Sequence, residues 1–85
     1  NFTRALAGEW GEFGISVNAL APGFFPSRLT EVALEHFGQS IIDATPLHRL
    51  GSAEDMQGAA VLLCSEAGRH ISGQILAIDG GLTAV

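Results

Sequence analysis

The sequence predicts an α/β protein in which parallel strands alternate with helices. Two apolar runs with strand character, residues 15–20 and 74–78, are separated by segments with helical periodicity. Neither face of the first run is convincingly polar, which favours a strand covered on both sides, as in a parallel sheet. Two strands with helices between them imply a right-handed crossover. We therefore expect the order helix, strand, helical excursion, helix, strand.

The first helix is predicted from apolar residues that recur at helical spacing, namely Phe2, Leu6, Trp10 and Phe13. Gly14 follows this stripe, and a glycine in left-handed conformation often ends a helix. The strand after it runs into Pro22 and Gly23. Pro22 has no N–H to continue a ladder, and Gly23 has no side chain to keep a ligand from the backbone. Open parallel sheets bind ligands at such strand ends.

Two more helices are predicted between the strands. The first has apolar residues on one face, with Thr30 as N-cap and Gly38 as stop; its face consists of Leu29, Val32, Ala33, His36 and Phe37. A short apolar turn at residues 41–42 precedes a break at Thr45. The next helix begins with a capping-box pattern at Ser52 and runs to about Ser65. A turn at residues 72–73 and the triplet 79–81 bound the last strand.

The composition of the chain excludes some classes of function. The chain has 85 residues, 47% hydrophobic and 15% charged, with a net charge of −5 and four arginines but no lysine. This charge leaves no basic patch for nucleic acid. The single cysteine, Cys64, cannot form an internal disulfide, and its apolar neighbours predict a buried thiol. We therefore expect the protein to reside in a reducing compartment. Without a membrane-length apolar run or a signal peptide, the expected location is cytoplasmic and no membrane partner is expected.

Several common chemistries lack their motifs. No Gly-x-Ser-x-Gly is present, and His36, His48 and His70 have no metal-ligand spacing, so no metal site is expected. We interpret His36 as a packing residue and the other two as surface residues. Neither a Gly-x-Gly-x-x-Gly nor a Walker loop occurs. A dinucleotide would therefore be contacted at the end away from its phosphates.

Five short motifs occur in order along the chain: Thr3-Arg4-Ala5-Leu6-Ala7-x-Glu9, the run from Gly14 to Gly23, Arg49-Leu50-Gly51, Ser72-Gly73-Gln74 and Asp79-Gly80-Gly81. Together they resemble the C-terminal third of a short-chain dehydrogenase/reductase. The resemblance implies the C-terminal part of a Rossmann-type doubly wound parallel sheet, with residues 15–20 and 74–78 as its last two strands. Residues 1–85 would be a single partial domain, with a variable substrate lid at about 24–46.

The resemblance also implies a cofactor site, for NAD or NADP. Pro22 and Gly23 would lie against the nicotinamide, the backbone of Phe25 would hold its carboxamide, and the Ser27 hydroxyl would replace the usual threonine hydroxyl. The lid residues that could line a substrate pocket are Phe24, Leu29, Val32 and Phe37. The alternative interpretation is that these four only pack the helix. Asn18, a polar residue in a buried strand, is expected to have a structural role.

The family's chemistry depends on a Tyr-x-x-x-Lys pair, and this chain contains neither tyrosine nor lysine. We therefore expect no catalytic residue among these 85, which would be inactive alone, and expect the pair just upstream of Asn1. The first hypothesis is a fragment of an NAD(P)-dependent oxidoreductase that interconverts an alcohol and a ketone, acting on a small molecule such as a sugar acid, as in the gluconate 5-dehydrogenase type. One alternative is the 3-oxoacyl-carrier-protein reductase type.

The other alternative is a noncatalytic piece with a structural or oligomerisation role. In the resembling family, the first helix and the last helix and strand are subunit-interface elements, which implies a homo-oligomer, dimer or tetramer. Because these faces and the outer strand edge would lack partners, we expect the isolated chain to be unstable or self-associating.

Overall fold

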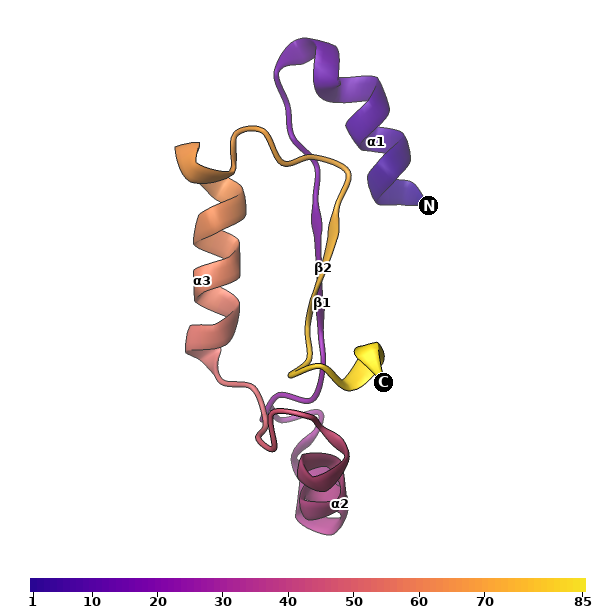
Figure 1. The fold of residues 1–85 in the computed structure, drawn as a ribbon, viewed down its shortest axis with the longest axis vertical. Coiled ribbons are helices and arrows are strands. Elements are labelled where there is room, and N and C mark those ends of the chain that lie inside the picture. Colours follow the sequence, from indigo (N-terminus) through magenta and orange to yellow (C-terminus); the bar gives the residue numbers. More distant parts are fainter. The chain divides into compact units, whose positions relative to one another are not determined.

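The computed structural model describes residues 1–85 and contains helices and one two-stranded sheet (Figure 1). Its helices are α1 (Phe2–Trp10), α2 (Glu31–Ala44) and α3 (Ala53–Cys64), its strands are β1 (Ala19–Pro22) and β2 (Ile75–Ile78), and its short 3-10 helices are η1 (Gly11–Phe13), η2 (Glu66–Gly68) and η3 (Leu82–Ala84). The residues form two compact units. One contains Asn1–Ala21 and Gln57–Leu76, and the other contains Pro22–Met56 and Ala77–Val85.

The two strands are paired and parallel, as predicted. In the first unit the Ala19 N–H donates to the Gln74 carbonyl at 2.9 Å. In the second unit the Gly23 N–H donates to the Ile78 carbonyl, also at 2.9 Å. Partner positions therefore increase together along both strands. β1 ends at Pro22, and the last bond of the pair comes from the glycine that follows the proline.

The prediction that the first strand covers residues 15–20 is wrong at both ends, because β1 begins at Ala19 and continues to Pro22. The segment opposite residues 17 and 18 is a turn rather than a strand. There the Val17 N–H donates to the Ser72 hydroxyl at 3.1 Å, and the Asn18 side chain bonds to backbone groups at 2.9 and 3.0 Å. One backbone bond remains here, from the Gly73 N–H to the Val17 carbonyl at 2.7 Å, and side-chain bonds supply the other contacts of this part of the segment.

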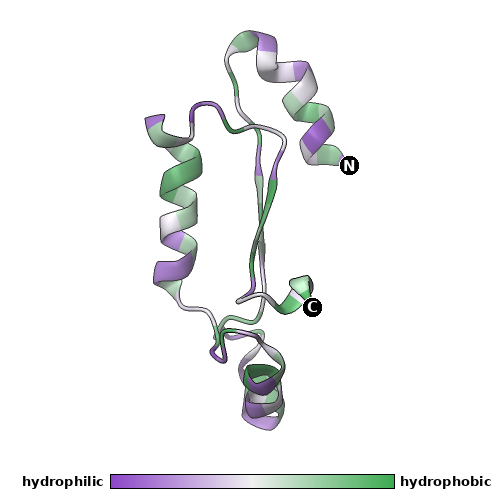
Figure 2. Ribbon diagram, viewed as in Figure 1, coloured by the Kyte–Doolittle hydropathy of each residue, from purple (hydrophilic) through white to green (hydrophobic).

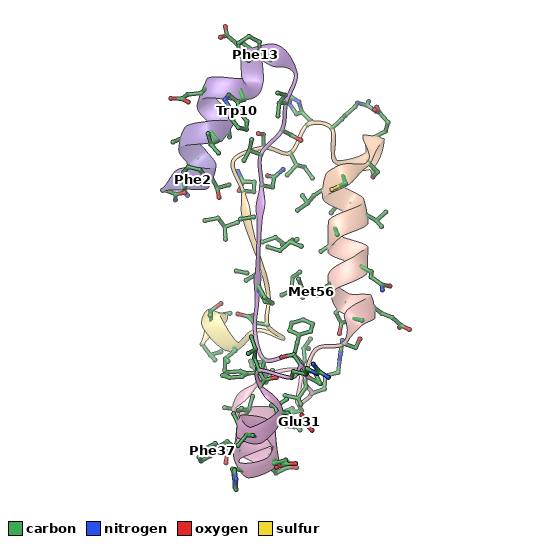
Figure 3. The ribbon with its side chains drawn as sticks, turned by 180° about the vertical axis from the view of Figure 1, so that it is seen from behind. Phe2, Trp10, Phe13, Glu31, Phe37 and Met56 are labelled. Carbon is green, nitrogen blue, oxygen red and sulfur yellow. The ribbon has the colours of Figure 1, made fainter.

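Helix α1 follows the predicted stripe as far as Trp10, and a 3-10 helix carries the chain on to the predicted stop at Gly14. The Asn1 side chain accepts a hydrogen bond from the Arg4 N–H at 3.4 Å, which caps the first turn. After η1, Gly14 takes a left-handed conformation with φ of 76°. The aromatic residues of this segment, Phe2, Trp10 and Phe13, are exposed and are labelled in Figure 3.

Helix α2 continues through Gly38 to Ala44, so the prediction that Gly38 stops it and that residues 41–42 form a turn is wrong. An interior glycine weakens a helix by only about 1 kcal/mol relative to alanine, which the remaining turns can offset. The helix ends at Thr45, which is extended with ψ of 124°. Pro46 follows, and a residue before proline is disfavoured in the helical region.

Helix α3 begins after Ser52, where the capping pattern places it. The Asp55 carboxylate accepts the Ser52 N–H at 2.7 Å, which is one half of a capping box. The Ser52 hydroxyl donates to the same carboxylate at 3.1 Å and does not bond a first-turn N–H.

Beyond the helix, Gly68 is buried, and a Cβ there would collide with the Leu62 carbonyl oxygen. Only glycine fits this turn.

No hydrophobic side chain of the chain is buried, and the one buried polar side chain is that of Thr45. Apolar residues nevertheless run along much of α3 and the strands (Figure 2). The prediction of a buried Cys64 is wrong, because the thiol-bearing residue is exposed on the uncovered surface of α3, as is Val61. None of the helices is both long and apolar enough to cross a membrane.

Candidate functional site

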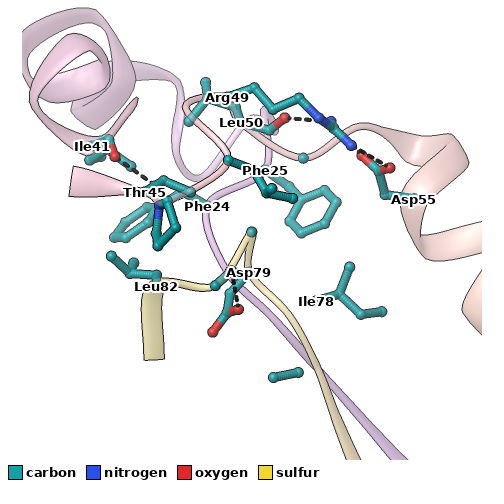
Figure 4. Close-up of a pocket in the computed structure, with 16 residues that line it drawn as sticks. Phe24, Phe25, Ile41, Thr45, Arg49, Leu50, Asp55, Ile78, Asp79 and Leu82 are labelled. Atoms are coloured by element: carbon teal, nitrogen blue, oxygen red, sulfur yellow. Dashed lines mark hydrogen bonds and ion pairs between the residues drawn. The ribbon is translucent and has the colours of Figure 1, made fainter. Parts of the chain in front are cut away.

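A cavity of about 480 Å³ lies entirely within the second unit, where β2 ends (Figure 4). Its walls come from the segment after β1, the C-terminal end of α2 with the loop that follows it, the start of α3 and residues 77–82. Its volume falls within the range of pockets that bind small molecules and cofactors. Both phenylalanines that follow Gly23, Phe24 and Phe25, line it. The cavity is therefore the candidate site of this unit.

Gly23 packs directly on the end of β2. A Cβ at this position would lie 2.8 Å from the Asp79 Cβ and 2.9 Å from the Asp79 Cα, so a side chain would force the two segments apart. The strand ends thus depend on the glycine that the sequence singled out. The structure places Pro22 as the last residue of β1, immediately before it.

Asp79 organises the turn at the end of β2. Its carboxylate accepts the Gly81 N–H at 3.0 Å, the Thr83 N–H at 3.1 Å and the Thr83 hydroxyl at 2.6 Å. These bonds favour the charged form, and the hydroxyl bond of Thr83 contributes most to lowering the pKa of Asp79. Gly80 and Gly81 have φ of 65° and 94°, so both use the left-handed region that glycine adopts without strain. The predicted end of the strand is confirmed.

The backbone carbonyls of Phe24 and Phe25 each accept a hydrogen bond, and the two bonds come from different parts of the unit. The Phe24 carbonyl accepts the Gly51 N–H at 3.2 Å, and the Phe25 ring fills the space where a Cβ on Gly51 would be. The Phe25 carbonyl accepts the Thr30 hydroxyl at 2.7 Å. The segment is thereby fixed between the start of α2 and the loop after it.

Ser27 and Thr30 bond to each other just before α2. Their hydroxyl oxygens are 3.1 Å apart, the Ser27 N–H donates to the Thr30 hydroxyl at 3.0 Å, and the Thr30 N–H donates to the Ser27 hydroxyl at 3.3 Å. Thr30 occupies the predicted N-cap position of α2, but its side chain makes no capping bond to that helix. The Ser27 hydroxyl thus belongs to a local network at the edge of the Phe25 segment.

The four predicted substrate-pocket residues are not brought together. Phe24 lines the cavity, whereas Leu29, Val32 and Phe37 lie outside its lining with 97%, 66% and 62% of their surfaces exposed. Phe37 projects from α2 in Figure 3. His36, interpreted from the sequence as a packing residue, is exposed, with its ring centroid 6.2 Å from that of Phe37.

Sequence reasoning gave no site role to two charged residues of the cavity wall, Arg49 and Asp55. They form a two-pronged ion pair, with Nη2 to Oδ1 and Nη1 to Oδ2 both at 2.9 Å (Figure 4). The Arg49 guanidinium, together with the bonds from Ser52, holds the pKa of the Asp55 carboxyl well below its usual range, and the pKa of Arg49 is raised. The sequence signal available for this ion pair was an arginine six positions before an aspartate in the first turn of α3. No cluster of three metal-ligating side chains is present.

Known proteins match this chain over nearly its whole length. A family model described as enoyl-(acyl carrier protein) reductase matches residues 1–83. The chain is 44% identical over 85 residues to gluconate 5-dehydrogenase of Gluconobacter oxydans, which covers 98% of the chain and 33% of that protein. It is 37% identical over 81 residues to 3-oxoacyl-[acyl-carrier-protein] reductase of Aquifex aeolicus, covering 95% and 33%. The chain thus spans about a third of the length of these relatives.

Solved structures match the fold equally well. The gluconate 5-dehydrogenase of Burkholderia cenocepacia, in complex with NADP and tartrate, superposes with a TM-score of 0.94 at 35% identity, over 99% of this chain and 34% of that one. A Beutenbergia cavernae protein assigned as an NAD(P)-dependent gluconate 5-dehydrogenase, with NADP bound at low occupancy, gives a TM-score of 0.93 at 42% identity, over 99% of this chain and 34% of that one. These matches confirm the predicted α/β, Rossmann-type architecture. The chain belongs to the short-chain dehydrogenase/reductase family.

Proposed function

We propose that this chain forms the nicotinamide side of the cofactor site in an NAD(P)-dependent oxidoreductase that interconverts an alcohol and a ketone. The observation that carries the proposal is the cavity beside Gly23, because it lies where parallel strands end and where Phe24 and Phe25 are held in place. The NADP in the matching structures of relatives supports the same assignment.

The residues present suit a flat ring that carries a carboxamide. Pro22 and Gly23 stand just before the cavity lining and add no bulky polar side chain there, and the main chain of Phe25, which lines the cavity, offers hydrogen-bonding groups for the carboxamide. The Ser27 hydroxyl lies outside the cavity lining and bonds Thr30, and we propose that it adds one cofactor contact at the edge of this segment. A bound nicotinamide cofactor supplies the hydride chemistry. The role of these residues is to orient the ring and to exclude water from one side of it.

The proton-transfer groups of this family are not among these 85 residues. The family's chemistry uses a Tyr-x-x-x-Lys pair, and the chain has neither residue type. We infer that the pair belongs to a larger protein in which residues 1–85 are one partial domain, and that the chain alone is inactive.

For the substrate we propose a small hydroxy compound of the sugar-acid class, bound under the lid at about 24–46. The names of the matching relatives favour this class, since several act on gluconate or related polyols. The exposed Leu29, Val32 and Phe37 of the lid are available to close over a substrate. The 3-oxoacyl thioester class is the second candidate, and the similarity to the Aquifex aeolicus reductase supports it.

A homo-oligomeric, dimeric or tetrameric, assembly is part of the proposal. The absence of any buried hydrophobic side chain supports it, and so does the exposure of Phe2 and Phe13 on α1 and η1, at 79% and 69%. A purely structural role for this chain, without catalysis in any larger protein, is the competing function.

A chimera tests the proposal. The B. cenocepacia gluconate 5-dehydrogenase would keep its own N-terminal two thirds and receive this chain in place of the matching third, and NADPH binding would be titrated by fluorescence. NADPH oxidation would then be measured with 5-ketogluconate and with an acetoacetyl thioester, and the 85-residue chain alone would serve as the inactive control. We expect NADPH binding and faster turnover of 5-ketogluconate. A folded chimera that does not bind NADPH would overturn the cofactor role and favour the structural one.

A further inference from the structure

The Arg49–Asp55 ion pair joins the two ends of the turn between α2 and α3. Besides its two bonds to Asp55, the Arg49 guanidinium donates to the Leu50 carbonyl at 3.1 Å. The same carboxylate accepts the N–H and the hydroxyl of Ser52 at 2.7 and 3.1 Å. Residues on both sides of Gly51 are therefore tied to one carboxylate in the first turn of α3.

Gly51, at the centre of this turn, touches the segment to which the cofactor role is assigned. Its N–H donates to the Phe24 carbonyl at 3.2 Å, and its missing side chain makes room for the Phe25 ring. A displacement of the turn would consequently move both phenylalanines. The ion pair, Phe25 and Thr45 line the same cavity, and Figure 4 draws the ion pair on the Asp55 side of the view and Thr45 on the other.

The pair contributes little to overall stability. The Arg49 and Asp55 side chains are 55% and 27% exposed, and exposed ion pairs contribute little because water already solvates both charges. Its geometry is nevertheless specific, because the planar guanidinium meets the carboxylate with two parallel hydrogen bonds. A bond of this type fixes a position more effectively than it stabilises a fold.

We propose that Arg49 and Asp55 are positioning residues that hold the Phe24–Phe25 segment, through Gly51, in the geometry that receives the nicotinamide carboxamide. This inference rests on the proposed cofactor role. Neither side chain needs to touch the cofactor. Loss of the pair should weaken cofactor binding much more than it changes the stability of the fold or the rate of turnover at saturating cofactor.

The test uses the chimera with Arg49→Met, Arg49→Lys, Asp55→Asn and a double variant that combines Arg49→Met with Asp55→Asn. Arg69→Met is the matched control, because Arg69 forms the other ion pair of the chain, an exposed 4.0 Å contact with Glu66. Each variant would be characterised by its Kd for NADPH, its KM for the cofactor, its kcat and its urea midpoint. Hydrogen exchange of the peptide that contains Phe24 and Phe25 would report on the segment itself.

We expect Arg49→Met and Asp55→Asn each to raise the Kd and KM for the cofactor roughly fivefold or more, with little change in kcat or urea midpoint. The double variant should be no worse than either single one, because both remove the same interaction. Arg49→Lys should bind the cofactor better than Arg49→Met because it keeps the positive charge. It should not reach the parent affinity, because an ammonium cannot form the two-pronged bond. Exchange at the Phe24–Phe25 peptide should be faster in the weakened variants, and Arg69→Met should match the parent.

Two results would overturn the inference. An Arg49→Met variant that binds NADPH as the parent does would show that the pair does not position the segment. An affinity loss that merely follows a large fall in the urea midpoint would show a general structural role. A parent chimera that folds without binding NADPH is a different result, because it removes the proposed function and this inference with it.

Discussion

Replacing Gly23 with alanine tests the contact that sets the strand ends at the site. The added Cβ would lie 2.8 Å from the Asp79 Cβ, whereas ordinary contact begins at 3.4 Å, so the segments must separate by 3.4 − 2.8 = 0.6 Å. The 2.9 Å bond from the Gly23 N–H to the Ile78 carbonyl lies in the same contact and would lengthen. Overpacking of this kind typically costs about 1–3 kcal/mol. The reduced freedom of the unfolded alanine chain would return about 0.4–1 kcal/mol.

The expected net result is a loss of up to about 2.6 kcal/mol, measured as the urea midpoint of the chimera by circular dichroism at fixed protomer concentration. Gly58→Ala is the matched control, because Gly58 lies inside α3 with nothing within 4 Å of its Cβ position. That variant should gain about 0.5–1 kcal/mol. The reasoning is refuted if Gly23→Ala leaves the midpoint unchanged or raises it while Gly58→Ala behaves as expected.

Three further predictions concern stability and assembly. Asn18→Ala removes two side-chain bonds and should cost about 1–3 kcal/mol in the chimera, whereas an unchanged urea midpoint would contradict this. The isolated 85-residue chain should self-associate or unfold, because it buries no hydrophobic side chain; a monomer by ultracentrifugation with a cooperative calorimetric transition would argue against it. The Thr83 hydroxyl bond lowers the pKa of Asp79, so this carboxylate stabilises the fold above the ordinary aspartate pKa of about 3.9 and loses this effect as pH falls through its lower folded value. The urea midpoint should therefore fall on acidification below about pH 4, and less steeply in Asp79→Asn; equal slopes in the two proteins would contradict the shift.

The periodic helices and the glycine turns were predictable because local chemistry alone specifies them. Gly14 and Gly80 take positive φ at the predicted ends of elements, and α3 begins at the capping pattern of Ser52. The end of α2 was not predictable from Gly38, because a glycine inside a helix and a glycine that ends one look identical in sequence. The proline after Thr45 was the stronger signal.

The remaining errors concern contacts between segments far apart in the sequence. Residues 15–18 have strand composition, but the turn opposite them makes one backbone bond to Val17 and otherwise bonds through the side chains of Ser72 and Asn18. Cys64 has apolar neighbours, but no residue of this chain covers it. At the site, the strand end at Pro22 and Gly23 was predicted from the residues themselves, and Phe24 and Phe25 were named through the family resemblance. The position of Arg49 against Asp55 depends instead on how the loop folds back.

The two bonds of Asn18 have a consequence for the pairing of the strands. The Gln74 N–H is held by the Asn18 side chain at 3.0 Å, while the Gln74 carbonyl accepts the Ala19 N–H at 2.9 Å. A slip of one residue would turn Asn18 to the other face of the sheet and break both of its bonds. An apolar strand pair has few other means of rejecting a slipped alignment. Asn18 therefore specifies the register of β1 against β2.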